Sequence, residues 1–237
     1  MNRKDSLGFT LVELMLSMAF LSALLLAIAM TVIQISNTYN RGTMLKDVNQ
    51  SGRSISAELQ RSISESAPFS IVSDEGVINS SFVDKEWGGR LCISQYAYIW
   101  NYGNTLNKTN PLEINRYSDT GNKSTVPIHF VKVRDAGASY CLDPSKPIDF
   151  SQSVELLLSG DHSLAIQKFD ITSPDTAKDD KARERLYSLD FYIGTNDSMA
   201  LNSDASACKQ PGEDDADIAR CSIQEFNIAI RAGNSVR

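Results

Sequence analysis

The stretch Gly8-Phe9-Thr10-Leu11-Val12-Glu13 leads directly into a long apolar run. No charged residue occurs from Leu14 to Asn40, and the part from Leu14 to Ile35 consists mainly of Leu, Met, Ala, Ile and Val. At about 1.5 Å of rise per residue, Leu14 to Ile35 spans roughly 33 Å as an α-helix, enough to cross the hydrocarbon core of a bilayer. We therefore expect a membrane-spanning helix that begins beside Glu13.

Glu13 is an acid at the start of an apolar helix. An ionised, unpaired carboxylate that is fully inserted in a bilayer costs at least about 2.5 kcal/mol. One interpretation places Glu13 near the lipid headgroups, where the helix dipole favours an acid in the first turn. In the other, Glu13 pairs with a cation, and cleavage after Gly8 would create one as the α-amino group of Phe9. A secretory signal peptide does not fit, because its small-residue cleavage site follows the apolar segment, whereas Gly8 precedes it. A plain single-span anchor remains an alternative.

The GFTLVE stretch resembles the prepilin signature of type IV pilins and type II secretion pseudopilins. The apolar helix after it and the short N-terminal segment before it, with Arg3 and Lys4, are part of the same resemblance. The resemblance covers the N-terminal quarter of the chain. It implies that prepilin peptidase cuts after Gly8 and that the new N-terminus, Phe9, is N-methylated. It also implies that Glu13 is the assembly carboxylate, which pairs with the terminal amine of a neighbouring subunit.

Two further segments are similar to PilW-type minor pilins and GspJ-type minor pseudopilins. The run from Gln50 to Arg61 contains Q-x-G-R followed by a leucine and a second arginine, and residues 157–169 follow a strand pattern of PilW-type proteins. Arg53 and Arg61 are equally compatible with two exposed arginines on a helix face. In the resembled family the major subunit tends to be short and often has a helix-breaking residue midway along this segment. This chain has neither Gly nor Pro from Phe9 to Arg41 and has a large head, so the resemblance implies a minor subunit.

The resemblance implies a structural subunit and no enzyme: a minor pilin that primes or caps assembly of a type IV pilus. Its partners would be prepilin peptidase, other major and minor pilins, an inner-membrane assembly platform and the membrane itself. It would sit in the inner membrane with its head in the periplasm, then reach the cell surface within a pilus or pseudopilus. The alternatives are a minor pseudopilin of a type II secretion system and a pilus-tip adhesin or DNA-uptake module. For the adhesin, the aromatic stretch Tyr96 to Tyr102 is either a recognition surface or a core strand.

Composition narrows the function classes. The 237 residues carry a net charge of −6, which argues against DNA binding, because phosphate contacts need a Lys/Arg patch. The sequence contains no G-x-S-x-G elbow, no H-E-x-x-H motif and no phosphate-binding glycine loop. We therefore expect no active site and no cofactor. Calcium bound by the acids of residues 213–217 is weighed against a solvated loop, which is preferred because the spacing is not that of an EF-hand.

The chain contains four cysteines, Cys92, Cys141, Cys208 and Cys221, and none of them forms a CxxC motif. An even number in a domain outside the cytoplasm indicates two disulfides, with zinc ligation and free thiols as alternatives. Three pairings are possible. We favour Cys92–Cys141 and Cys208–Cys221, because the second pair closes a short polar loop, worth about 3 kcal/mol in the chain-entropy model.

The predicted fold class is α+β, with a long N-terminal helix packed by its second half on an antiparallel β-sheet head, as in type IV pilins. The expected segments are a leader (1–8), a transmembrane assembly helix (9–36), an amphipathic continuation of that helix (37–67) and a β-rich head (68–237). In the continuation an apolar stripe at helical spacing is predicted to form core, Gly42 and Gly52 weaken the helix locally, and Pro68 ends it. The stripe residues are Leu45, Val48, Ile55, Leu59 and Ile63.

Alternation of apolar and polar residues predicts the strands of the head. We expect residues 154–158 and 164–171 to pair with each other around a turn at 159–162. In 126–133, Ile128 and Phe130 should share one face, and His129 is interpreted as structural. The predicted strands are 91–100, 112–117, 126–133, 154–158, 164–171, 186–193 and 226–231.

Overall fold

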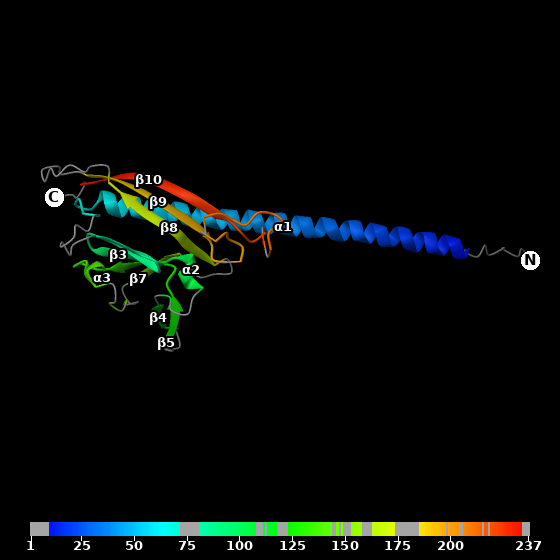
Figure 1. The fold of residues 1–237 in the computed structure, drawn as a ribbon, viewed down its shortest axis with the longest axis horizontal. Coiled ribbons are helices and arrows are strands. Elements are labelled where there is room, and N and C mark those ends of the chain that lie inside the picture. The colour runs from blue at the N-terminus through cyan, green and yellow to red at the C-terminus, as the bar shows by residue number, and fades with distance from the viewer. Residues whose placement is uncertain are drawn as a thin grey trace, which may run out of the picture.

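The structure is a computed structural model of the whole chain. It describes residues 10–71, 81–107, 111, 113–117, 123–143, 146, 148, 153–157, 163–173, 185–197, 199–203, 206–214, 216–217 and 219–233. Figure 1 shows a long helix that carries the head on its C-terminal half, while its N-terminal half extends beyond the head.

The helix α1 runs without interruption from Leu11 to Ser64. Residues 10–39 are all exposed, and Asn40 is the first residue that is partly covered. From there a stripe with helical spacing is buried, which confirms the amphipathic pattern. Leu45 is an exception, because it is 42% exposed and the preceding residue, Met44, takes the expected place one turn before Val48. The buried positions are Met44, Val48, Gly52, Ile55, Leu59, Ser62 and Ile63.

The head contains two larger antiparallel sheets, and its α+β class is as predicted. Sheet A has the strand order β1-β2-β3-β6-β7, and sheet B has the order β10-β9-β8. Sheet A consists of β1 (Phe82–Lys85), β2 (Gly88–Ile93), β3 (Tyr96–Asn101), β6 (Phe130–Arg134) and β7 (Ser153–Leu157). Sheet B consists of β8 (Leu164–Thr172), β9 (Arg185–Thr195) and β10 (Ile223–Ala232). A separate hairpin pairs β4 (Glu113–Tyr117) with β5 (Lys123–Pro127), and the short helices are α2 (Gly103–Leu106) and α3 (Ser139–Leu142).

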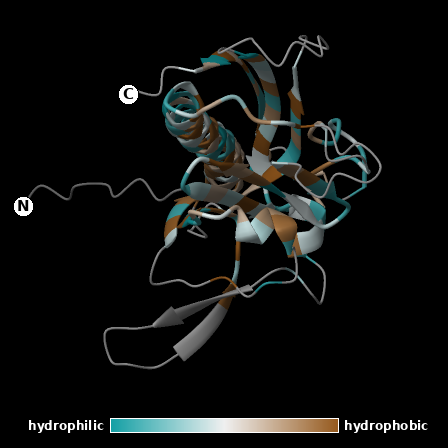
Figure 2. Cartoon of the chain, turned by 90° about the vertical axis from the view of Figure 1, so that its left-hand side faces the viewer, coloured by the Kyte–Doolittle hydropathy of each residue, from teal (hydrophilic) through white to brown (hydrophobic). Residues whose placement is uncertain are grey.

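The main core lies between α1 and the two sheets. The helix packs chiefly on β10 and β9 and also contacts β7. Figure 2, viewed close to the axis of α1, shows the strands to one side of the helix and below it, with hydrophobic and hydrophilic residues alternating along several of them. In β9 the side chains of Tyr187, Leu189, Phe191 and Ile193 are fully buried, as the alternation predicts.

Sheet A is covered on both faces. Leu91, Tyr98 and Trp100 belong to the core shared with the helix. Their neighbours along the strands, Cys92 and Ile99, form a second cluster on the opposite face, under α3. Because both faces are buried, β3 and the second half of β2 are almost continuously apolar, and strict alternation is lost there.

Three sequence predictions about strands are wrong. Residues 91–100 form two strands of a hairpin, because Ser94 adopts a positive φ of 55° and turns the chain. Residues 126–133 are divided at Ile128 between β5 and β6, which belong to different sheets, and Ile128 and Phe130 lie in different clusters.

Within the described part of the chain, the predicted pairing of residues 154–158 with 164–171 is also absent. Strand β7 pairs with β6 in sheet A, and β8 pairs with β9 in sheet B. Both segments present apolar residues to the same core, so their hydrophobic patterns are compatible with either arrangement. The expected turn at 159–162 lies outside the described residues.

Gly52 lies where α1 crosses β10. A Cβ atom at this position would lie 1.9 Å from Cζ of Phe226, whose ring stacks on Phe191 with centroids 5.4 Å apart. The missing side chain therefore allows the ring to pack directly on the helix backbone. The sequence indicates only the lower helix propensity of glycine and not this contact.

We expect Gly52→Ala to destabilise the head by roughly 1–3 kcal/mol, because the ring of Phe226 must move out of a packed site. Gly42→Ala is the matched control, since nothing lies within 4 Å of its added Cβ. There the higher helix propensity of alanine should add up to about 1 kcal/mol. Thermal unfolding of the full chain in detergent measures both, and equal shifts of the same sign would contradict the steric explanation.

Candidate functional site

The N-terminal half of α1 presents a large apolar surface. By length and composition α1 is apolar enough to cross a membrane, and none of its most apolar stretch is buried against the head. Apolar patches of this extent are rare on soluble monomers and mark membrane or protein contacts. The half-helix is therefore compatible with a membrane anchor. Its exposed large side chains include Leu11, Val12, Leu14, Met15, Leu16, Met18, Phe20, Leu21, Leu24, Leu25, Leu26, Ile28, Met30, Val32, Ile33 and Ile35.

Thr10 and Glu13 close the N-terminal end of this helix as a capping box. The Thr10 backbone N–H and hydroxyl donate to Oε2 of Glu13 at 2.9 and 2.8 Å, and the Glu13 backbone N–H donates to Oγ1 of Thr10 at 3.3 Å. Such reciprocal bonds satisfy backbone donors that the first turn leaves free. Within this chain Glu13 thus acts as a helix-terminal acid, while its second oxygen, Oε1, has no partner among the described residues. Gly8 and Phe9 lie outside the described residues.

A cluster of polar side chains holds the C-terminal half of α1 on sheet A. Glu58 of α1 accepts from Nζ of Lys132 at 2.6 Å and from the hydroxyl of Tyr98 at 3.1 Å through the same oxygen, Oε1. The single proton of the Tyr98 hydroxyl is shared between Glu58 and Oγ of Ser62, and the Lys132 ammonium lies 3.7 Å from the centroid of the Tyr96 ring. Because these bonds join one turn of the helix to two strands, they set the rotation of α1 relative to the head.

This cluster shifts the ionisation of its members. Burial by itself would raise the pKa of Glu58, but the hydrogen bond and the charge of Lys132, with the bond from Tyr98, hold that pKa below its usual value. Burial raises the pKa of Tyr98, so its hydroxyl stays protonated. The folded head therefore stabilises the ionised form of the Glu58 side chain relative to its protonated form.

We expect the head to lose stability as the pH falls below the ordinary pKa of a glutamate. A carboxyl whose pKa is lowered in the folded state contributes its full stability above the unfolded-state pKa and loses it as it is protonated. A hydrogen bond to a charged group is worth roughly 1.5–3 kcal/mol. Melting temperatures of the full chain in detergent between pH 3 and 7 should fall less with acid for Glu58→Gln than for the wild type. Parallel curves for the two proteins would exclude this role of Glu58.

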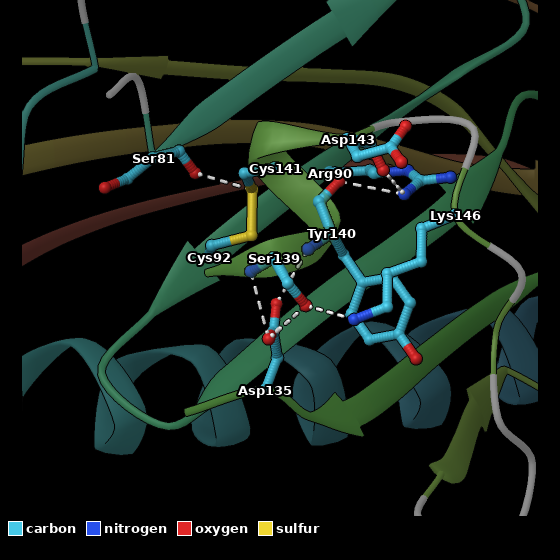
Figure 3. Close-up of a disulfide and its surroundings, with 9 residues drawn as sticks. All are labelled: Ser81, Arg90, Cys92, Asp135, Ser139, Tyr140, Cys141, Asp143 and Lys146. Carbon is cyan, nitrogen blue, oxygen red and sulfur yellow. Dashed lines mark hydrogen bonds between the residues drawn. A yellow bond between two sulfur atoms is a disulfide. The ribbon is translucent and has the colours of Figure 1, made fainter. Parts of the chain in front are cut away.

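The disulfide Cys92–Cys141 links α3 to sheet A and joins two cysteines that are 49 positions apart in the sequence. Figure 3 shows the residues around it. Both oxygens of Asp135 accept bonds at the start of α3: the backbone N–H and hydroxyl of Ser139 donate to Oδ1 at 3.0 and 2.8 Å. The Tyr140 N–H donates to Oδ2 at 2.9 Å. These contacts hold the α3 segment over the outer face of sheet A.

Arg90 is fully buried beneath α3. Its Nη1 donates to the carbonyl oxygens of Tyr140 at 2.8 Å and Asp143 at 3.3 Å. Burial lowers its pKa, and the charge of Asp143 opposes that shift. Because its guanidinium donates to backbone carbonyl oxygens, Arg90 acts as a structural residue that holds the α3 segment on β2.

The second disulfide, Cys208–Cys221, closes a shorter loop with a separation of 13. Both pairings favoured from the sequence are thus present, and no free cysteine remains. Of the nearby acids, Asp215 lies outside the described residues. Among the residues that the structure describes, no three His, Cys, Asp or Glu side chains converge on a common point suited to a metal.

Two other sequence interpretations concern the head. His129 is buried, its Nδ1 contacts the carbonyl oxygen of Leu164, and burial lowers its pKa, consistent with a structural histidine. In the aromatic stretch 96–102, Tyr98 and Trp100 are fully buried, and Trp100 packs on Phe169 with ring centroids 4.4 Å apart. These two rings form core, whereas Tyr96 at the start of the stretch is 37% exposed.

Two neighbouring cavities were missed by sequence reasoning. One, of about 320 Å³, lies between α2 and the loop after β9. The other, of about 430 Å³, lies where α1 enters the head. Their walls come from segments far apart in the chain, so no local motif marks them. The larger one is lined by Asn40, Met44, Ser163, Thr195, Asn196, Asp197, Ala219 and Arg220.

A scan against protein-family models finds no match to this chain, and searches of curated proteins and of solved structures return no match either. The long apolar N-terminal helix packed on antiparallel sheets is consistent with a pilin-like architecture.

Proposed function

We propose that this protein is a minor pilin, a low-abundance subunit that primes or caps a type IV pilus after cleavage between Gly8 and Phe9. The main support is the division of α1. Its residues 10–39 are exposed and mostly apolar, whereas its second half buries one stripe of residues against a head with two disulfides. An anchor followed by an oxidised head suits a protein whose head leaves the cytoplasm.

The exposed half-helix has two apolar environments in this function. Before assembly it lies in lipid, and within a filament the same surface packs against the helices of other subunits. Transfer between lipid and protein changes the hydrophobic free energy little, because lipid tails are as apolar as leucine side chains. A helix suited to the membrane is therefore also suited to a filament core.

Glu13 provides the polar contact in this exchange. The capping bonds from Thr10 use Oε2, and Oε1 remains open to a cation from outside the chain. We expect that cation to be the N-terminal amine on Phe9 of a neighbouring subunit. The pairing is favourable because a desolvated carboxylate without a partner is costly.

The large head and the uninterrupted helix favour a minor subunit, but a minor pseudopilin of a type II secretion system would share both. The adhesin alternative loses the support of Tyr98 and Trp100, because both side chains are buried. A DNA-uptake role is opposed by the net charge of −6. The neighbouring genes distinguish a minor pilin from a minor pseudopilin. A gene for a retraction ATPase favours a pilus, and a gene for a secretion channel alone favours a pseudopilus.

Mass spectrometry of the protein purified from cells tests the proposal directly. We expect residues 1–8 to be absent and the N-terminus to be N-methylated Phe9. A strain without prepilin peptidase is the control, and there the full chain should accumulate. Functional protein that retains residues 1–8 would refute the proposal.

A further inference from the structure

The larger cavity lies at the end of the head nearest the apolar half of α1. It is lined by Asn40 and Met44, respectively the first partly covered and the first buried residues of the helix. The other walls come from Ser163 and from two segments near the loop closed by Cys208–Cys221. Figure 1 shows this loop, in orange, beside α1 at the point where the helix leaves the head.

This position corresponds to the level of the lipid headgroups. The apolar run ends at Ile35, and at about 1.5 Å per residue Asn40 lies roughly 7 Å farther along the helix axis. A bilayer of 40–45 Å with a hydrocarbon core of about 30 Å leaves a headgroup layer of roughly 5–7 Å on each side. A helix that fills the hydrocarbon core with its apolar run therefore places the cavity beside the headgroups.

The cavity has a cation on one part of its wall and an anion on another. Arg220 is 72% exposed, and its only ion pair among the described residues is a long contact of 3.7 Å between Nε and Asp217. Most of its guanidinium donors are thus available to an anion. Asp197 uses Oδ1 to accept from the N–H of Met199 at 2.9 Å, while Oδ2 has no partner within the described part of the chain.

Neutral polar groups complete the wall. The side-chain oxygen of Asn196 accepts from Nδ2 of Asn107, and the Asn196 amide donors have no partner among the described residues. The Asn40 side chain has no hydrogen bond to a described residue. The Thr195 hydroxyl is fully used, since its one proton is shared between the carbonyl oxygens of Arg220 and Ser222 and its oxygen accepts from the Ser222 N–H. Thr195 therefore shapes the wall, and the two asparagines can contact a ligand.

We propose that this cavity holds the phosphoethanolamine headgroup of a membrane phospholipid while α1 spans the bilayer. Arg220 binds the phosphate, because a guanidinium matches phosphate oxygens. Asp197 accepts from the primary ammonium. None of the described lining residues is aromatic, whereas a quaternary ammonium such as choline is typically recognised by aromatic faces. The cavity is thus better suited to ethanolamine than to choline. The Asp197 carboxylate disfavours anionic headgroups that carry no ammonium group.

This inference depends on the membrane placement of the proposed function, but not on cleavage or assembly. A bound headgroup would fix the base of the head on the membrane surface. Extraction into a filament would then require its release.

Full-length protein in nanodiscs, analysed by native mass spectrometry for retained lipid, tests the proposal. Nanodiscs contain equal parts of phosphatidylethanolamine, phosphatidylglycerol and phosphatidylcholine. We expect phosphatidylethanolamine to be retained at least about fivefold over either other lipid. Arg220→Ala should abolish this retention, and Asp197→Asn should reduce the preference for phosphatidylethanolamine over phosphatidylglycerol.

Arg53→Ala is the matched control, because Arg53 is an exposed arginine of α1 outside the cavity. It should retain lipid as the wild type does. Equal retention of the three lipids, or equal effects of Arg220→Ala and Arg53→Ala, would overturn the proposal. Soluble glycerophosphoethanolamine should not displace the lipid at equimolar concentration, and displacement would identify the free phosphodiester as the ligand instead. N-terminal mass spectrometry of the same samples shows separately whether residues 1–8 are removed.

Discussion

Glu13→Ala is expected to leave the protein in the membrane and remove it from filaments. The variant keeps the apolar surface of α1, so insertion and cleavage after Gly8 should continue. Under the proposed function it loses the carboxylate that would neutralise the N-terminal amine of a neighbouring subunit, and that amine would be left desolvated without a partner. We expect incorporation to fall at least about tenfold, measured by immunoblotting sheared filaments against the membrane fraction.

Two further variants separate the charge of Glu13 from its capping bonds. Glu13→Gln keeps an oxygen that can accept from Thr10 but carries no charge, so it should fail to assemble as Glu13→Ala does. Thr10→Ala removes the hydroxyl that donates to Oε2 and accepts from the Glu13 N–H. It should cost the helix about 1 kcal/mol and still assemble. Normal incorporation of Glu13→Gln would show that capping, and not charge, is what assembly needs.

Removal of the Cys92–Cys141 disulfide should produce the largest loss of head stability. The bond closes a long loop and holds α3 on sheet A, and loss of a native disulfide typically costs 2–5 kcal/mol. For a head of this size we expect the double variant Cys92→Ser, Cys141→Ser to melt roughly 5–15 °C lower than the wild type. Near-ultraviolet circular dichroism of the full chain in detergent measures the midpoint.

The second disulfide provides the comparison. Cys208–Cys221 closes a shorter loop, so the chain-entropy model assigns it about 1 kcal/mol less. Its double serine variant should melt above the Cys92–Cys141 variant and below the wild type. An unchanged midpoint without Cys92–Cys141 would mean that the buried arginine and Asp135 hold α3 without help from the covalent bond.

Local patterns in the sequence predicted the features that depend on neighbouring residues. An uncharged apolar run predicted the exposed half of α1, a spacing of three, four and seven predicted its buried stripe, and alternation predicted the inward face of β9. These features follow from helix and strand geometry, because residues at fixed spacings share a face wherever the segment lies. The favoured cysteine pairs are also present, since the short loop and the even count left few choices.

Contacts between distant segments decided the rest. Which sheet receives β7 and which receives β8 depends on packing around α1, and their hydrophobic patterns fit either sheet. Gly52 looked like a weak point of the helix, and only the ring of Phe226 against it shows why a side chain does not fit. The cavity at the base of the head joins Asn40, Asp197 and Arg220, and no spacing in the sequence reveals that they meet. Sequence alone determined the helix and its polarity, because periodicity is local; the tertiary structure decided strand partners and cavities, because these depend on residues that folding brings together.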